Sequence, residues 1–189
     1  YSSLGTAGQS TNYTIYVKDG SGCEATYVQT VTIPAVLTIS ISGSAPTCYD
    51  GTTTITATAS GGTGTKQYSL NGGAYGSSTT FTVGNGVHSV TVKDANNCTT
   101  TSNSLSFNTT APNATITASN YNGYTISCNG GSDGSIAVSG GSGGTGSGYS
   151  ASTDNSTWFA LPKTFYNLNY ANSPYNIYIK DSSNCVQTY

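Results

Sequence analysis

The chain has 189 residues, of which only 6% are charged, and its formal net charge at pH 7 is −2. Five lysines without any arginine are too few for a basic nucleic-acid surface, and no apolar run approaches the roughly 20 residues that span a bilayer. Abundant Gly, Tyr, Thr, Ser and Asn with no Met disfavour helices and favour strands. The composition therefore predicts an all-β protein that works outside the cell.

Two phrases that each contain a cysteine recur along the chain. The first reads Val/Ile-Lys-Asp-x-x-x-Cys and occupies residues 17–23, 92–98 and 179–185. The second begins at Cys48 and at Cys128, continues to Asp-Gly and Thr or Ser, and precedes an alternating run that ends in Gly-Gly. Such self-similarity indicates tandem repeats.

The repeats predict three units, with boundaries at Pro34 and Pro112. Residues 1–34 are read as the last three strands of one repeat, residues 35–111 as a complete repeat, and residues 112–189 as a nearly complete one. Units of this length suit β-sandwiches of roughly 100 residues or fewer. The short proline-containing joints predict an elongated chain of sandwiches, and a start within a repeat predicts that the sequence is part of a longer protein.

In chain order, alternation of apolar residues with Thr and Ser predicts antiparallel strands. In the first repeat the strand before residue 17 is preceded by one expected at residues 1–4. Seven strands are expected in the middle repeat, at 36–42, 52–60, 65–70, 73–77, 79–83, 87–93 and 100–108. Asp19, Asp94 and Asp181 end the repeated strand, where they are expected to accept backbone hydrogen bonds from the following turn. An inward tyrosine that opens this strand resembles the tyrosine corner of immunoglobulin-like sandwiches.

The combined order of motifs resembles the SprB-type repeat of large bacterial gliding-motility adhesins. It runs Cys, Asp-Gly-Ser/Thr, Gly-Gly, Tyr-Ser, Phe-x-x-Leu, and finally the alternating strand with Lys-Asp-x-x-x-Cys. The resemblance covers nearly the whole chain, although His88 replaces the usual aromatic residue, the Cys48 phrase is shortened, and residues 139–148 are enlarged. It implies a type IX-secreted adhesin at the bacterial cell surface, associated with the outer membrane and moved by the motility machinery.

An enzyme is not expected. His88 is the single histidine, and it stands where the other repeats have Tyr13 and Tyr175, which is not where a catalytic base is expected. The glycines between 141 and 146 match G-x-G-x-x-G, but a strand rather than a helix is expected after them. The sequence therefore predicts no catalytic and no cofactor-binding residues.

Two kinds of binding site remain open. Asp50, Asp94, Asp133 and Asp181 could supply oxygen ligands for calcium, although Asp residues in such turns more often serve the backbone. Trp158, Phe159, Tyr166 and Tyr170 could form a platform for a carbohydrate, although aromatic residues more often fill a core.

An extracellular β protein with two cysteines per repeat is expected to form disulfides. Five predicted strands separate Cys48 from Cys98, which places them at opposite ends of their sandwich and favours a Cys48–Cys185 bond across the joint between repeats. The other cysteines would then pair outside this sequence. If strand 73–77 is absent, the parity reverses and the pairs become Cys48–Cys98 and Cys128–Cys185.

The repeats thus predict tandem immunoglobulin-like sandwiches, and the resemblance implies that they form the rigid stalk of a secreted adhesin. Its expected partners are neighbouring repeats, an external surface or polysaccharide, and the motility machinery through the parent protein, with no nucleic acid and no membrane span. The alternative is a carbohydrate-binding β-sandwich that uses the aromatic residues of the third repeat.

Overall fold

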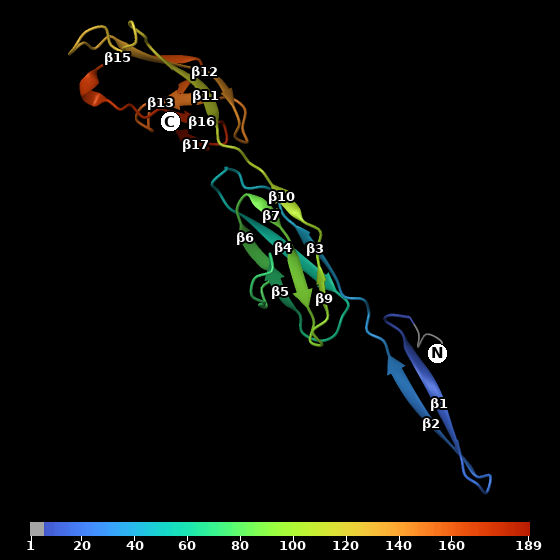
Figure 1. Cartoon of the computed structure of the whole chain (residues 1–189). Coiled ribbons are helices and arrows are strands. Elements are labelled where there is room, and N and C mark those ends of the chain that lie inside the picture. Colours follow the sequence, from blue (N-terminus) through green and yellow to red (C-terminus); the bar gives the residue numbers. More distant parts are fainter. Residues whose placement is uncertain (1–5) are drawn as a thin grey trace. The chain divides into compact units, whose positions relative to one another are not determined.

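The structure, a computed structural model, describes residues 6–189 (Figure 1). Its regular elements are β-strands in antiparallel pairs, together with one short 3-10 helix, η1 (Tyr170–Asn172). The prediction of an all-β protein is therefore confirmed. The strand expected at residues 1–4 lies outside the described residues.

Contacts divide the chain into two compact units. One comprises residues 1–43, 54–81 and 87–105, and the other comprises residues 44–53, 82–86 and 106–189. The second unit thus joins the whole third repeat to loops that belong, by sequence, to the middle repeat. The division into three repeats stays a prediction from the sequence.

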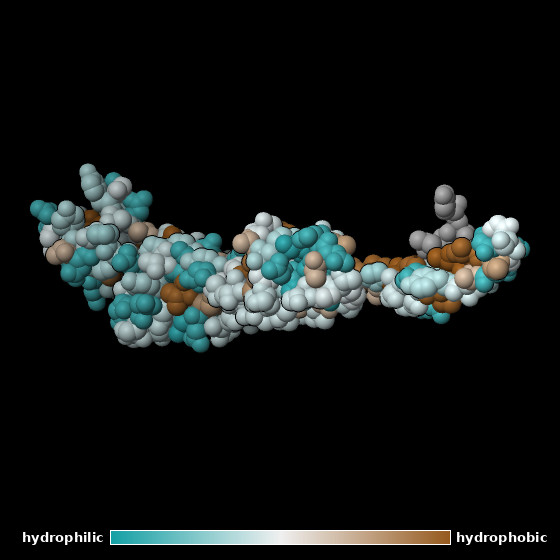
Figure 2. Space-filling view, turned by 90° about the horizontal axis from the view of Figure 1, so that it is seen from below, coloured by the Kyte–Doolittle hydropathy of each residue, from teal (hydrophilic) through white to brown (hydrophobic). Residues whose placement is uncertain are grey.

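The first repeat contributes a hairpin of β1 (Ser10–Lys18) and β2 (Glu24–Thr32), which pair without a bulge. The alternation places Ile15 and Val17 on one face, where Tyr27 lies opposite Ile15. These three side chains are exposed, because the hairpin forms a sheet of two strands only, and hydrophobic surface (brown) is visible on it in Figure 2. The hairpin therefore has an apolar face with no second sheet packed on it in the described chain.

The middle repeat forms two three-stranded sheets and one pair of short strands. One sheet has the order β3 (Thr38–Ser42), β4 (Thr53–Ser60), β6 (Thr80–Val83), and the other has the order β5 (Gln67–Leu70), β8 (Val90–Lys93), β9 (Thr99–Thr101). β7 (Gly86–His88) pairs with β10 (Leu105–Phe107). The buried hydrophobic side chains of this repeat are Ile55, Ala57, Tyr68, Val83, Val90, Val92 and Phe107.

Two expected strands are broken and one is reduced to a bridge. The strand expected at 87–93 divides into β7 and β8, and the strand expected at 100–108 divides into β9 and β10. At this break the Ser102 hydroxyl accepts the hydrogen bond of the Val90 N–H, 3.1 Å away, so a side chain replaces the backbone in the ladder. The strand expected at 73–77 appears only as the antiparallel bridge between Tyr68 and Gly76.

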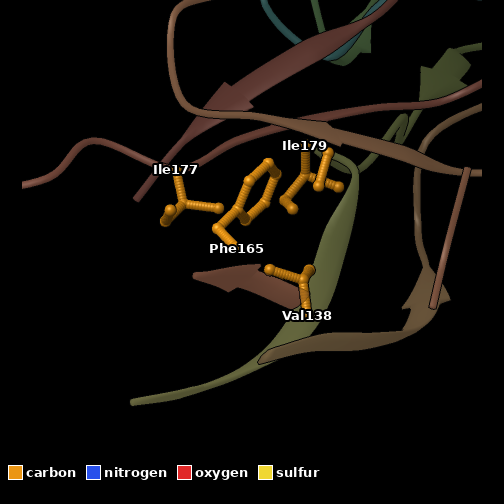
Figure 3. Close-up of a cluster of buried hydrophobic side chains, with 5 residues drawn as sticks. Val138, Phe165, Ile177 and Ile179 are labelled. Atoms are coloured by element: carbon orange, nitrogen blue, oxygen red, sulfur yellow. The ribbon is translucent and has the colours of Figure 1, made fainter. Parts of the chain in front are cut away.

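The third repeat folds around one hydrophobic core. One sheet has the order β11 (Asn113–Ala118), β12 (Gly134–Ser142), β15 (Lys163–Leu168). The other has the order β14 (Phe159–Ala160), β13 (Ser150–Ser152), β16 (Tyr178–Lys180), β17 (Val186–Thr188). The core contains Val138 and Phe165 from the first sheet, and Ala151 and Ile179 from the second, with Ile177 beside them (Figure 3). Two sheets that share a buried core are consistent with a β-sandwich.

Candidate functional site

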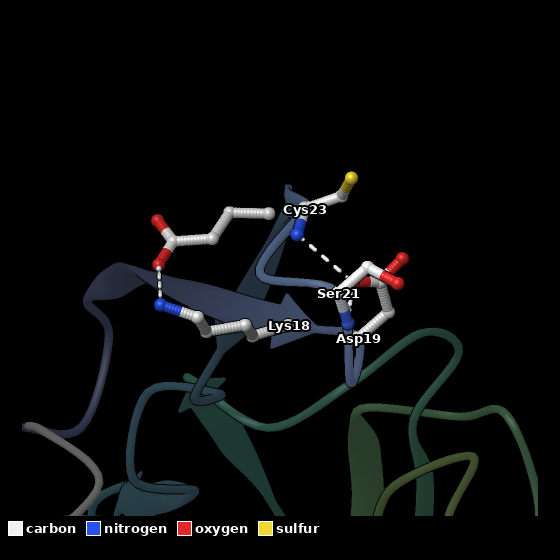
Figure 4. A network of polar contacts seen from close by, with 5 residues as sticks. Lys18, Asp19, Ser21 and Cys23 are labelled. Carbon is white, nitrogen blue, oxygen red and sulfur yellow. Dashed lines mark hydrogen bonds and ion pairs between the residues drawn. The ribbon is translucent and has the colours of Figure 1, made fainter.

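Three turns that join an aspartate to a cysteine share one hydrogen-bond pattern. We call residues 19–23, 94–98 and 181–185 the aspartate–cysteine turns. In the first, Asp19 Oδ1 accepts hydrogen bonds from the backbone N–H groups of Ser21 and Cys23, both at 2.9 Å (Figure 4). Asp94 and Asp181 accept the same two bonds in their turns. The predicted role of these aspartates is confirmed.

The residue before the cysteine explains the rest of the repeated phrase. Gly22, Asn97 and Asn184 occupy this position with φ of 90°, 65° and 64°. Only Gly, and less often Asn or Asp, adopts such angles at low cost. The repeated phrase leaves this position variable, although its restriction to Gly or Asn is visible in all three copies.

In the two larger repeats the aspartate also fastens a glycine-containing loop. Asp94 Oδ2 accepts from the Thr63 N–H and hydroxyl, at 2.9 and 3.0 Å. Asp181 Oδ2 accepts from the N–H groups of Thr145 and Gly146, at 2.9 and 3.1 Å. Each carboxylate therefore connects its own turn to a loop more than thirty residues earlier in the chain.

These hydrogen bonds favour the charged form of the carboxylates. Backbone N–H groups, chiefly that of Cys23 for Asp19 and that of Thr63 for Asp94, lower the pKa of both groups below 3.8. For Asp181, burial opposes ionisation, but hydrogen bonds from Gly146, Cys185 and Thr145 outweigh burial and lower its pKa as well. The turns are thus stabilised by ionised aspartates at neutral pH.

The four calcium candidates lie in separate places. Asp94 and Asp181 belong to different turns, where both carboxylate oxygens accept backbone hydrogen bonds. Asp133 Oδ1 accepts from the Ser127 N–H at 3.1 Å, and Asp50 lies in an exposed loop. Within residues 6–189, no three His, Cys, Asp or Glu side chains form a group that could hold a metal ion.

A disulfide joins Cys48 to Cys185, with 5.3 Å between their Cα atoms. Cys48 opens a four-residue turn in which the Gly51 N–H donates to the Cys48 carbonyl at 3.0 Å. This is the pairing favoured by the count of five predicted strands between Cys48 and Cys98. That count includes the strand at 73–77, of which the structure has only the bridge between Gly76 and Tyr68 of β5. The structure has neither of the alternative pairs, because Cys98 and Cys128 are free and exposed, as is Cys23.

Polar contacts hold both sides of this disulfide. The Thr145 hydroxyl donates to the Thr47 carbonyl at 2.6 Å, next to the bond. Asn85 donates to the carbonyls of Tyr49 and Thr109, at 2.9 and 2.8 Å, and accepts from the Thr109 N–H at 3.0 Å. The Cys48 loop is therefore fixed by neighbours on either side, all within the second compact unit.

The four aromatic residues of the predicted carbohydrate platform lie on different elements. The Lys180 ammonium lies 4.3 Å from the Trp158 ring centroid, and that of Lys163 lies 4.1 Å from the Phe159 centroid. Tyr166 is exposed on β15, and Tyr170 is exposed on η1. Two of the rings are thus covered by lysines, and the other two stand free.

Tyr170 instead lines an open groove of about 490 Å³ in the third repeat. The opposite wall is the loop of residues 124–130, which includes Tyr124, Cys128 and Asn129. Tyr124 and Tyr170 are among the most exposed aromatic side chains, at 74% and 78%. No pattern in the sequence indicates this groove, because its walls come from a non-periodic loop and a single turn of 3-10 helix.

The structure places His88 and the glycine motif in structural roles. His88 is buried at the end of β7, with Nδ1 3.2 Å from the Asn71 side-chain nitrogen. Tyr175, at the equivalent place, bonds through its hydroxyl to the backbone of Asn169, six residues upstream, as a tyrosine corner does. Gly141, the first glycine of the motif, lies near the end of β12. The chain then continues through a loop into the strand β13.

A scan against protein-family models finds no match for the chain, and a comparison with curated proteins finds no significant relative. Over residues 6–189, no helix has both the length and the apolar character needed to cross a membrane.

Proposed function

We propose that this chain is a segment of a repetitive secreted adhesin, in which tandem immunoglobulin-like sandwiches form a rigid stalk for surface attachment and gliding motility. Its immediate partners are neighbouring repeats of the same chain. The parent protein would engage an external surface or polysaccharide and the outer-membrane motility machinery. The proposal places the chain outside the cell, at the bacterial surface, and assigns it neither catalysis nor a cofactor.

The observation that carries the proposal is the Cys48–Cys185 disulfide. It connects a loop that the sequence assigns to the middle repeat with an aspartate–cysteine turn of the third repeat. A covalent bond between segments that the sequence assigns to consecutive repeats, supported by the Thr145–Thr47 hydrogen bond, would restrict bending at the predicted joint. Disulfides also persist mainly in oxidising compartments, which supports an extracellular location. The resemblance to SprB-type repeats supports the adhesin role.

Carbohydrate binding by the third repeat is the weaker candidate. Of its four proposed residues, Trp158 and Phe159 have lysine ammonium groups over their rings. A sugar would have to displace each cation before it could stack on the ring face that the lysine covers. Tyr166 and Tyr170 are accessible, but they belong to a strand and to a separate 3-10 turn.

The stalk is tested by small-angle X-ray scattering of the oxidised chain and of a Cys48→Ser variant. We expect an elongated particle, with greater flexibility in the variant. A near-spherical particle would contradict the proposal.

Antibodies against this chain should label intact cells that produce the parent protein and should slow their attachment or gliding. A polysaccharide array should give no binding, and binding that Tyr166→Ala or Tyr170→Ala removes would favour the carbohydrate-binding alternative.

A further inference from the structure

The disulfide is the covalent part of a larger contact between a loop and a turn. Cys185 is almost fully buried, at 1% exposure, and Cys48 and Tyr49 are half-buried. The Thr145 hydroxyl, from the loop that Asp181 fastens, donates to the Thr47 carbonyl. Here the Cys48 loop therefore receives an aspartate–cysteine turn together with its glycine-containing loop.

The third repeat carries the same receiving loop, and no aspartate–cysteine turn within residues 6–189 is bonded to it. The Gly131 N–H donates to the Cys128 carbonyl at 3.0 Å, as the Gly51 N–H does to the Cys48 carbonyl. Yet Cys128, its neighbour Ser127 and the following Asn129 are all exposed. Beside them lies the open groove of about 490 Å³ whose walls include Tyr124 and Tyr170. The loop that is covered in the middle repeat is thus bare in the third.

The chain also carries unoccupied copies of the other half of this contact. Cys23 and Cys98 end aspartate–cysteine turns with the hydrogen bonds of the Cys185 turn, but both are free and exposed. Figure 4 shows that the Cys23 sulfur points away from its turn. The Cys98 turn is the more complete of the two, because Asp94 fastens the Thr63 loop as Asp181 fastens the Thr145 loop. Receiving and inserting halves therefore coexist in one molecule.

We propose that the groove beside Cys128 is a docking surface for an aspartate–cysteine turn of a second copy of this chain, and that Cys128 forms a disulfide with the cysteine of that turn, Cys23 or Cys98. The Cys48–Cys185 contact is the precedent for this docking, because there the equivalent loop holds the equivalent turn. Two copies of the chain should repel each other only weakly, because each has a net charge of −2 at pH 7. Because the receiving and inserting surfaces differ, the contact is heterologous and can continue from copy to copy.

The bond forms by thiol–disulfide exchange, with a small disulfide such as oxidised glutathione as the oxidant. The Cys128 thiolate attacks one glutathione sulfur, which gives a mixed disulfide and releases one glutathione thiolate. The thiolate of the docked turn then attacks the Cys128 sulfur and releases the second glutathione thiolate. Two protein thiols are oxidised and one oxidised glutathione is reduced. This inference goes beyond the proposed stalk. It depends on the Cys48–Cys185 contact and on the exposed Cys128 loop, and it does not require that the chain serve as a stalk.

The test uses the full chain, with its Cys48–Cys185 bond intact, in a glutathione redox buffer at neutral pH. After free thiols are blocked, non-reducing gels and peptide mass mapping identify the linked cysteines. We expect covalent dimers and larger chains in which Cys128 is joined to Cys23 or Cys98. Cys128→Ser and the double variant Cys23→Ser/Cys98→Ser should both stay monomeric, with unchanged circular dichroism and an intact Cys48–Cys185 bond.

A matched control moves the thiol off the receiving position. Ser132 is exposed four residues beyond Cys128, so Ser132→Cys in the Cys128→Ser background keeps an accessible thiol on the same surface. We expect this variant to form no specific link to Cys23 or Cys98. Equal linkage by the moved thiol, Cys128–Cys128 bonds as the main product, or glutathione adducts alone would overturn the proposed docking. None of these results would bear on the stalk, which scattering tests separately.

Discussion

Ile15 and Ile177 hold the same position in the repeated strand, but the Ile15 side chain is 50% exposed and the Ile177 side chain is 3% exposed. Ile177 packs with Val138 and Phe165 between two sheets (Figure 3). Ile15 lies on a two-stranded hairpin. The same residue in a closely similar local sequence therefore has different energetic weight in the two places, because burial depends on strands that are distant in the chain.

The first prediction compares the two isoleucines. Ile177→Ala should lower the free energy of unfolding by about 2–5 kcal/mol, because it removes buried methyl groups and leaves a cavity. Ile15→Ala should change it by less than about 0.5 kcal/mol. Urea unfolding followed by circular dichroism measures both changes. Equal losses would mean that the hairpin is packed in solution.

The second prediction concerns acid. Asp19, Asp94 and Asp181 have pKa values below the usual value in the folded chain, so the unfolded chain takes up protons first as the pH falls. The stabilisation is complete above about pH 4 and is lost progressively below it, toward the folded-state pKa values. Urea unfolding between pH 5 and pH 2 should show this loss, and Asp94→Asn should make it smaller. A free energy of unfolding that stays constant over this range would contradict the role of the aspartates.

The third prediction tests the contact between Asp181 and the glycine-containing loop. Gly144 has φ of 70°, and a Cβ there would collide with Asp181 Oδ2. Gly140 has a similar φ of 62°, but the nearest atom to its Cβ would be Thr115 Oγ1, at 3.9 Å. Gly140→Ala should cost about 1–2 kcal/mol from backbone strain alone. Gly144→Ala should cost more, as measured by thermal unfolding, and a smaller cost than that of Gly140→Ala would refute the contact.

The fourth prediction concerns the disulfide. Cys48→Ser should destabilise the second compact unit by about 2–5 kcal/mol, because the bond closes a loop over a separation of 137 residues. The fluorescence of Trp158, the single tryptophan, reports the unfolding of this unit. Cys98→Ser, at an exposed free thiol, is the matched control and should have little effect. A reducing agent should destabilise the native chain but not the Cys48→Ser variant, and an equal response of both would contradict this prediction.

The alternation in the sequence predicted strands well where one face is buried. Ile55 and Ala57 are buried on β4 while the threonines between and beside them are exposed, which is the pattern expected from the sequence. It did not predict the break in the strand at 87–93, because the Ser102 hydroxyl enters the ladder there. A side-chain hydrogen bond of this kind leaves no trace in a hydrophobic pattern.

The candidate site likewise has one part that the sequence predicts and one part that it does not. The aspartate–cysteine turns depend on residues within five positions, so the repeated phrase contained all their determinants. The bond between Thr145 and Thr47 spans 98 residues and lies in a glycine-rich loop without periodicity. Its donor could not be identified from the sequence, because the path of that loop depends on left-handed backbone angles that strongly favour glycine, as at Gly143 and Gly144.

The disulfide also changes the route by which a mechanical load travels along the chain. A pull applied to the two termini passes from Cys48 directly to Cys185 through the sulfur atoms. The strands between these residues lie on a closed branch that carries no tension while the bond is intact. The contour length that this branch withholds from extension is about 450–490 Å for a separation of 137 residues. Under oxidising conditions residues 49–184 are therefore withheld from extension, and reduction would release the whole branch to the load.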